Sequence, residues 1–380
     1  MGCPKSGLEV DLAVPEAEQR VELGGPVDVL MAGANELDPT PRGRSLNLLI
    51  RASAEPAGGQ WGPRGLYDPN PWVQRQAVEA LAARLPETES AQALEAFIER
   101  ADVDPYVRGT AGLRLARIGR TQGLPTLTAA WQGEPEPWRR APLAAAALAM
   151  GDTSALAPLS AVLASGDLPL EVDFVLDLGR AGLLDVVPAL REGEKVIEEE
   201  LRLPYAAARI ALGDPSGEGA LRRALSSDIV ELRLEALDYL TRMREPAATA
   251  LLRKARSNDS ELVRWYAQLA LVSRSQVDVD RLSAGYASED LEVRVMAVRF
   301  AGELGIAESL SKRDERVARE VVRLALNADE PTLREAALRA LLDLGLDGEE
   351  EVLQRNLGNE YLAVRVEAAG ALLLLDPQRG

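Results

Sequence analysis

Three aromatic residues, Trp72, Tyr106 and Trp138, recur in one sequence context. Each follows a proline and directly precedes the anchor, the first position of a repeated pattern, which is apolar in most copies. Exposed Trp and Tyr side chains make strong contacts with partners, since they combine a large apolar surface with a polar group. Stacked repeats would place the three rings in a row, which predicts a docking surface for a peptide or a partner helix. In the alternative interpretation each ring packs on the preceding helix and only fixes the start of its own.

An arginine follows the same apolar position in eight of ten units. It lies in the first turn of its helix, where the helix dipole does not favour a cation, so its recurrence requires another partner. An aspartate or a carbonyl in the turn of the next repeat would supply one and would create a structural ladder along one edge. The predicted ladder consists of Arg108, Arg140, Arg202, Arg233, Arg264, Arg294, Arg334 and Arg365.

Two units depart from the pattern. The fourth unit has Asp173 where the arginine is expected, and we expect a bend or a weakened interface there. About ten residues are inserted between Gly305 and Leu333, which predicts a longer first helix with a charged extension. Function is best sought at such departures, because positions that all copies share are explained by packing.

Composition excludes several kinds of chemistry. The chain has no histidine and one cysteine. Ser–His and Cys–His nucleophiles are therefore excluded, as are an internal disulfide and a thiolate zinc site. We predict no catalytic residue, no metal ligand and no cofactor, and therefore a protein that is not an enzyme. The net charge of −17 disfavours binding to nucleic acid, which depends on Lys and Arg.

The first residues, MGCPKS, fit two lipidation patterns. Gly2 could accept a myristoyl group, with Cys3 beside it for a second chain. Alternatively, Gly-Cys before a polar linker is typical of a bacterial lipoprotein signal whose apolar segment is absent here, and Cys3 would then carry the lipid. The expected location is the periplasmic side of the cell envelope or, if neither pattern is used, the cytoplasm. Membrane contact is expected only through such an anchor.

Small helices must position these residues. Ten anchors, nine of them apolar and the third Arg139, run from Val73 to Val364 at spacings of 29 to 40 residues. Two antiparallel helices of about twelve residues with short turns need this length. Alanine recurs four residues after the anchor and glycine twelve after it, which suits close helix packing and a left-handed C-cap. Residues 1–44 show no helical period and are expected to form an irregular tether. Residues 45–380 form the repeats, with 45–70 as an N-terminal cap region.

The segments DPYVRGTAGLRLARIG, SEDLEVRVMAVRFAGELG and ADEPTLREAALRALLDLG carry the pattern best. Over about residues 70 to 380 the chain resembles the HEAT-repeat family, in the short variety of roughly thirty residues found in phycobilin lyase subunits. The resemblance implies an all-α, right-handed superhelical solenoid of about ten helical hairpins. It also implies a scaffold or adaptor that presents a curved groove to a protein or peptide partner. A subunit of a chromophore lyase or other modifying enzyme is the alternative, and a nucleic-acid-binding HEAT protein is a weaker one.

Overall fold

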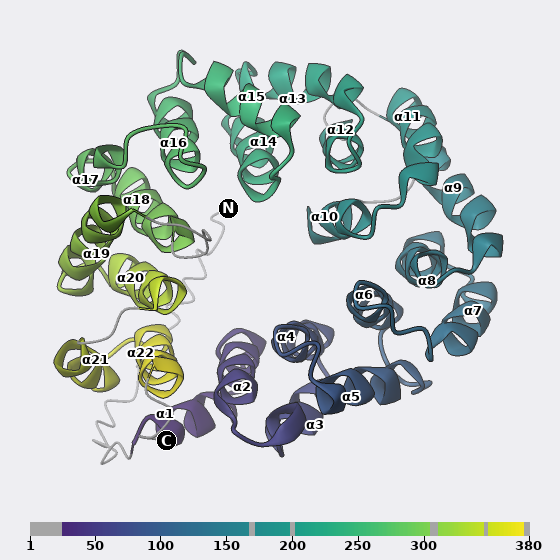
Figure 1. Cartoon of the computed structure of the whole chain (residues 1–380), viewed down its shortest axis with the longest axis horizontal. Helices are drawn as coiled ribbons and strands as arrows, with labels where there is room; N and C mark the ends of the chain where they lie inside the picture. Colours follow the sequence, from purple (N-terminus) through teal and green to yellow (C-terminus); the bar gives the residue numbers. More distant parts are fainter. Residues whose placement is uncertain (1–24, 167–171, 198–201, 305–310, 346–348, 376–380) are drawn as a thin grey trace, which may run out of the picture.

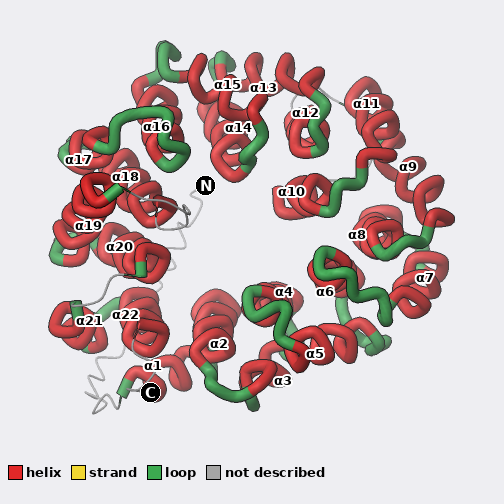
Figure 2. Tube along the Cα trace, viewed as in Figure 1, coloured by secondary structure: helices red, strands yellow, loops and turns green. Residues whose placement is uncertain are grey.

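A computed structural model describes residues 25–166, 172–197, 202–304, 311–345 and 349–375. Within these residues the chain forms α-helices, short 3-10 turns and no strands, so the predicted all-α class is confirmed. Figure 2 shows the helices in two concentric layers. The outer helices are α1 (Pro26–Gly33), α3 (Trp61–Leu66), α5 (Thr88–Ile98), α7 (Leu124–Gly133), α9 (Leu156–Ser165), α11 (Val187–Val196), α13 (Glu218–Leu225), α15 (Pro246–Ala255), α17 (Asp280–Tyr286), α19 (Lys312–Leu326) and α21 (Glu350–Leu357). The inner helices are α2 (Pro39–Ala52), α4 (Pro71–Ala82), α6 (Pro105–Ala116), α8 (Pro137–Ala149), α10 (Val172–Arg180), α12 (Arg202–Ala211), α14 (Val230–Arg242), α16 (Glu261–Val272), α18 (Leu291–Leu304), α20 (Pro331–Leu344) and α22 (Leu362–Leu375).

The inner helices pack in parallel, one repeat after another. A Cβ atom added to Gly109 of α6 would lie 2.5 Å from the backbone of Pro142 in α8. One turn later, a Cβ on Gly112 would lie 2.8 Å from the Cβ of Ala146. Both contacts run in the same direction along the two helices, and small residues permit the close approach. The apolar core lies between the two layers and continues from hairpin to hairpin.

Capping residues stand at both ends of these helices. The Asp104 side chain accepts hydrogen bonds from the backbone nitrogens of Tyr106 and Val107, at 2.9 and 3.3 Å, and so caps the start of α6. Gly213 follows α12 with a φ of 81°, the left-handed conformation that favours glycine. The predicted longer helix is α19, with 15 residues, and Ser311 caps it.

The hairpins close into a ring (Figure 1). Helices α1 and α2 pack against α22, so the first described helices lie on the last one. Gly370 of α22 approaches α2 so closely that an added Cβ would lie 2.6 Å from Leu48. The sequence predicted a solenoid but gave no sign of its closure.

The expected irregular segment is wrong from Pro26 onward, because α1 and the first residues of α2 lie within residues 1–44. Helix α1 buries Val29 and Leu30 but is only 8 residues long, too short to show a helical period. Its packing surface is α22, at the other end of the chain. Residues 45–70 hold the rest of α2 and all of α3. Residues 1–24 lie outside the described part.

Candidate functional site on the inner face of the ring

Helix α10 leaves the row of inner helices and projects into the ring interior (Figure 1). The neighbouring outer helices α9 and α11 pack directly on each other. Helix α10 packs against α12 and also contacts α6. This departure lies where the sequence predicted one, in the unit that has Asp173 in place of the arginine.

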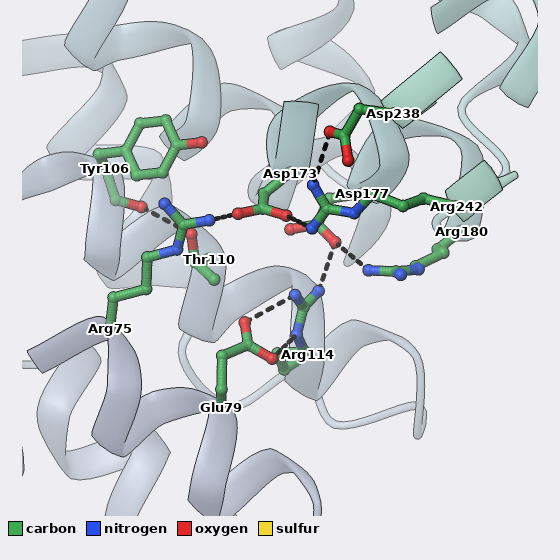
Figure 3. A network of polar contacts seen from close by, with 10 residues as sticks. All are labelled: Arg75, Glu79, Tyr106, Thr110, Arg114, Asp173, Asp177, Arg180, Asp238 and Arg242. Atoms are coloured by element: carbon green, nitrogen blue, oxygen red, sulfur yellow. Dashed lines mark hydrogen bonds and ion pairs between the residues drawn. The ribbon is translucent and has the colours of Figure 1, made fainter. Parts of the chain in front are cut away.

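Asp173 binds two arginines from distant parts of the ring (Figure 3). One carboxylate oxygen pairs with Arg75 of α4. The other accepts a hydrogen bond of 2.6 Å from Nη2 of Arg242 in α14, and Nη1 of Arg242 lies 3.5 Å from Asp238. Asp173 therefore links α4 and α14, which lie at the bottom and the top of the ring in Figure 1.

One turn further along α10, Asp177 is almost fully buried. It accepts a hydrogen bond of 2.6 Å from Nη1 of Arg114 and another of 3.2 Å from Nη1 of Arg180. Nη2 of Arg114 donates to Glu79 at 2.7 Å, so its guanidinium joins α4, α6 and α10 (Figure 3). Burial alone would lower the pKa of Arg114, but Asp177 and Glu79 outweigh it and raise the pKa above its usual value.

Tyr106 lies beside this network and is only partly exposed. Its ring packs on Phe174 of α10, with ring centres 6.4 Å apart and planes inclined by 58°. The guanidinium carbon of Arg75 lies 5.8 Å from the centre of the Tyr106 ring. Tyr106 thus fixes α10 against α6. This is a packing role, but the ring contacts a later helix and not the preceding helix that the alternative interpretation named.

Trp72 and Trp138 keep 39% and 46% of their surface exposed. Trp72 lies over Gly43 of α2, where an added Cβ would be 2.3 Å from its ring. The ring of Trp138 has the guanidinium carbon of Arg139 at 5.8 Å. Because the inner helices are parallel, both tryptophan side chains lie at the same edge of the ring of helices. Of the three predicted residues, these two remain accessible.

The predicted arginines make a recurring contact, but most of them do not form the expected ladder between repeats. Most of its members donate to a carbonyl in the turn of their own hairpin, as Arg233 does to Ser227 at 2.7 Å. The prediction of a bond to the next repeat is wrong for them, because the turn before each helix is closer to its first-turn side chain. Among the contacts between described residues, Arg294 is the one of the eight that pairs with the next hairpin, 3.3 Å from Glu330. The own-hairpin donors are Arg108, Arg140, Arg202, Arg233, Arg264, Arg334 and Arg365.

Two other arginines make the contacts between repeats that the ladder was expected to make. Arg274, at the end of α16, donates to the carbonyls of Thr241 and Met243 at 3.2 and 2.7 Å, and so caps α14. Arg84, at the end of α4, donates in the same way to Ile50 and Ser53 of the preceding hairpin, at 2.9 and 2.8 Å. Cations are favoured at helix C-termini. The sequence contained a signal for this contact, because both arginines stand eleven residues after the anchor of their unit.

The closure of the ring has its own ion-pair cluster. Arg44 of α2 donates twice to Glu367 of α22, at 2.7 and 2.7 Å, and Arg339 of α20 donates to the same carboxylate at 2.9 Å. Burial alone would raise the pKa of Glu367, but the hydrogen bonds and charges of the two arginines lower it below its usual value.

These charged groups hold the helices of the ring to one another. In the described part of the chain, no three His, Cys, Asp or Glu side chains are placed to hold a metal ion. No described helix is long and apolar enough to cross a bilayer. Cys3, the predicted lipid attachment site, lies outside the described residues.

Comparison with known proteins gives a family match for part of the chain: residues 64–149 match HEAT repeats. No curated protein matches. Among solved structures, an engineered protein is similar over 93% of this chain and 99% of its own, at 18% identity and a TM-score of 0.34. Human deoxyhypusine hydroxylase, solved with glycerol, is similar over 74% of this chain and 94% of its own, at 16% identity and a TM-score of 0.28. The chain is thus an all-α helical-repeat protein whose residues 64–149 match HEAT repeats.

Proposed function

We propose that this HEAT-repeat ring is a non-enzymatic scaffold that binds a protein or peptide partner along the edge carrying Trp72 and Trp138. The proposal rests on the exposure of these two tryptophan side chains, 39% and 46%, at equivalent positions of parallel helices. Leaving large apolar side chains in water costs free energy, and the packing of the helices does not require this exposure. Aromatic residues also contribute much of the binding energy in many interfaces.

Closure of the ring supports this role. A partner that binds a preformed surface does not have to order it, so more of the contact energy appears as affinity. The cluster around Asp173 and Asp177 fixes α10 against α4, α6 and α14 from the inside. The positions of Trp72 and Trp138 are therefore held by contacts at both ends of the α4–α10 segment.

The test is capture of the native partner by the purified protein, with Trp138→Ala and with Trp72→Ala/Trp138→Ala. Trp138 gives the clearer test, because Trp72 also packs on Gly43 and its replacement removes that contact as well. Leu324→Ala is the matched control, because Leu324 is 49% exposed on outer helix α19. We expect capture to fall at least about tenfold for both tryptophan variants and to stay unchanged for the control. Unchanged capture by folded tryptophan variants, judged by circular dichroism, would refute the proposal.

A further inference from the structure

A cavity of about 510 Å³ lies where the ring closes, between α2, α4 and α20. This volume lies within the range of small-ligand sites, roughly 300–1,000 Å³. Its lining includes three arginines, Arg44, Arg51 and Arg339, together with the exposed ring of Trp72. It therefore adjoins the surface proposed above to bind a partner.

The arginines of this cavity already bind one carboxylate. Glu367 receives two hydrogen bonds from Arg44 and one from Arg339. Planar guanidinium groups match carboxylates in this way, through paired and charge-assisted hydrogen bonds. Arg339 is also paired with Glu335, at 2.6 Å. Two of the three cations are thus neutralised by acids of the ring itself.

Arg51 is different. It lies in the last turn of α2 and makes no hydrogen bond or ion pair with any residue that the structure describes. Partial burial and the neighbouring Arg44 lower the pKa of Arg51, whereas the charges of Asp343 and Glu367 raise it, and the lowering is the larger effect. These two carboxylates therefore compensate its positive charge only in part. Asp343 also lines the cavity and acts on Arg51 through its charge, but the two form no salt bridge in the described part of the chain. An added anion would neutralise Arg51.

Apolar surface stands beside this charge. The ring of Trp72 and the side chain of Leu342 both line the cavity. A ligand that carries a carboxylate next to an apolar side chain would fill both parts. Such an arrangement is a common feature of an acidic peptide and not of an inorganic anion.

We infer that the cavity at the closure of the ring binds an acidic peptide segment, with one carboxylate on Arg51 and an adjacent apolar side chain against Trp72 and Leu342. The inference rests on the proposed scaffold function and names the chemistry of its partner. Charge complementarity selects the occupant, since the unpaired group is a guanidinium and the paired ones bind carboxylates.

The test is fluorescence polarisation of the full chain with a fluorescein-labelled peptide, Gly-Ser-Leu-Glu-Leu-Glu-Gly-Ser, and with its counterpart in which Gln replaces Glu. The variants are Arg51→Gln and the matched control Arg316→Gln. Arg316 is also exposed and has no partner among the described residues, but it lies on outer helix α19. We expect the Glu peptide to bind, the Gln peptide to bind at least about tenfold more weakly, and Arg51→Gln to weaken binding by a similar factor. Arg316→Gln should match the wild type.

Three results would overturn the inference: equal binding of the two peptides, wild-type affinity in Arg51→Gln, or no binding at about 1 mM. Free glutarate binding as tightly as the peptide, with the same dependence on Arg51, would also overturn it in favour of a small-molecule site. Failure here is separable from failure of the scaffold function. Trp138 does not line this cavity, so loss of the native partner by Trp138→Ala alone would leave the scaffold standing.

Discussion

Asp173 and Asp177 form a natural matched pair for asking what holds α10 inside the ring. They stand one helical turn apart on the same helix and both bind arginines, but their burial differs. Asp177 is 3% exposed, whereas the side chain of Asp173 is 36% exposed. Replacing each by Asn removes the charge and keeps the size. We predict that Asp177→Asn loosens α10 and that Asp173→Asn barely does.

The magnitude follows from the partners. Breaking a buried ion pair costs about 3–5 kcal/mol when the remaining charge is left alone. Arg114 keeps its second partner, Glu79 at 2.7 Å, and the Asn oxygen can still accept one hydrogen bond, so we expect about 2 kcal/mol for Asp177→Asn. Exposed pairs contribute about 0–1 kcal/mol, which is the expectation for Asp173→Asn.

The assay is amide hydrogen exchange of α10, which reports local opening even where unfolding of the whole ring is not two-state. At about 1.4 kcal/mol per factor of ten, Asp177→Asn should speed exchange in α10 about 30-fold and Asp173→Asn less than about fivefold. Helices far from the cluster, such as α20, should exchange at the wild-type rate in both variants. Equal acceleration in the two variants would refute the reasoning, because the buried and the exposed ion pairs would then contribute equally.

Three further predictions follow from the ion pairs and the N-terminus. Because folding lowers the pKa of Glu367, the contribution of this residue to stability is complete above its unfolded pKa of about 4.3 and is lost as the pH falls through the lowered value. Small-angle scattering should show the ring opening in that pH range. A constant ring dimension would contradict this. Arg274→Ala should reduce the free energy of unfolding by about 2–3 kcal/mol, because three carbonyls lose their hydrogen-bond donor. Arg294→Ala breaks one partly exposed ion pair and should reduce it by less than about 1 kcal/mol. Urea titration that gave the opposite order would contradict the prediction. Mass spectrometry of the N-terminal peptide from the native host should show a lipid on Cys3, and an unmodified peptide would exclude the anchor.

The hairpins could be predicted from the sequence because their signals are local. The apolar anchor, the alanine one turn later and the terminal glycine all act within a single helix. Ring closure could not be predicted in this way. It depends on a small rotation per repeat summed over the whole chain, and its ion pair joins residues 323 positions apart.

The candidate site was only partly predictable for the same reason. Asp173 marked the position of the departure, because it broke a local pattern. Its partners Arg75 and Arg242 could not be assigned, since which distant helices meet α10 depends on the closed ring. Tyr106 shared the sequence context of Trp72 and Trp138, yet its ring packs on Phe174 of α10. Local context did not distinguish the accessible rings from the packed one.

Photo-crosslinking in the native host tests the central claim most directly. Benzoylphenylalanine placed at Trp138 reports contacts on the proposed binding edge, and the same group at Leu324 reports contacts on the outer layer. A discrete crosslinked partner at position 138 that is absent at position 324 is the result that a scaffold binding through its inner edge predicts. Identical products at both positions, or a partner crosslinked only at position 324, would contradict it.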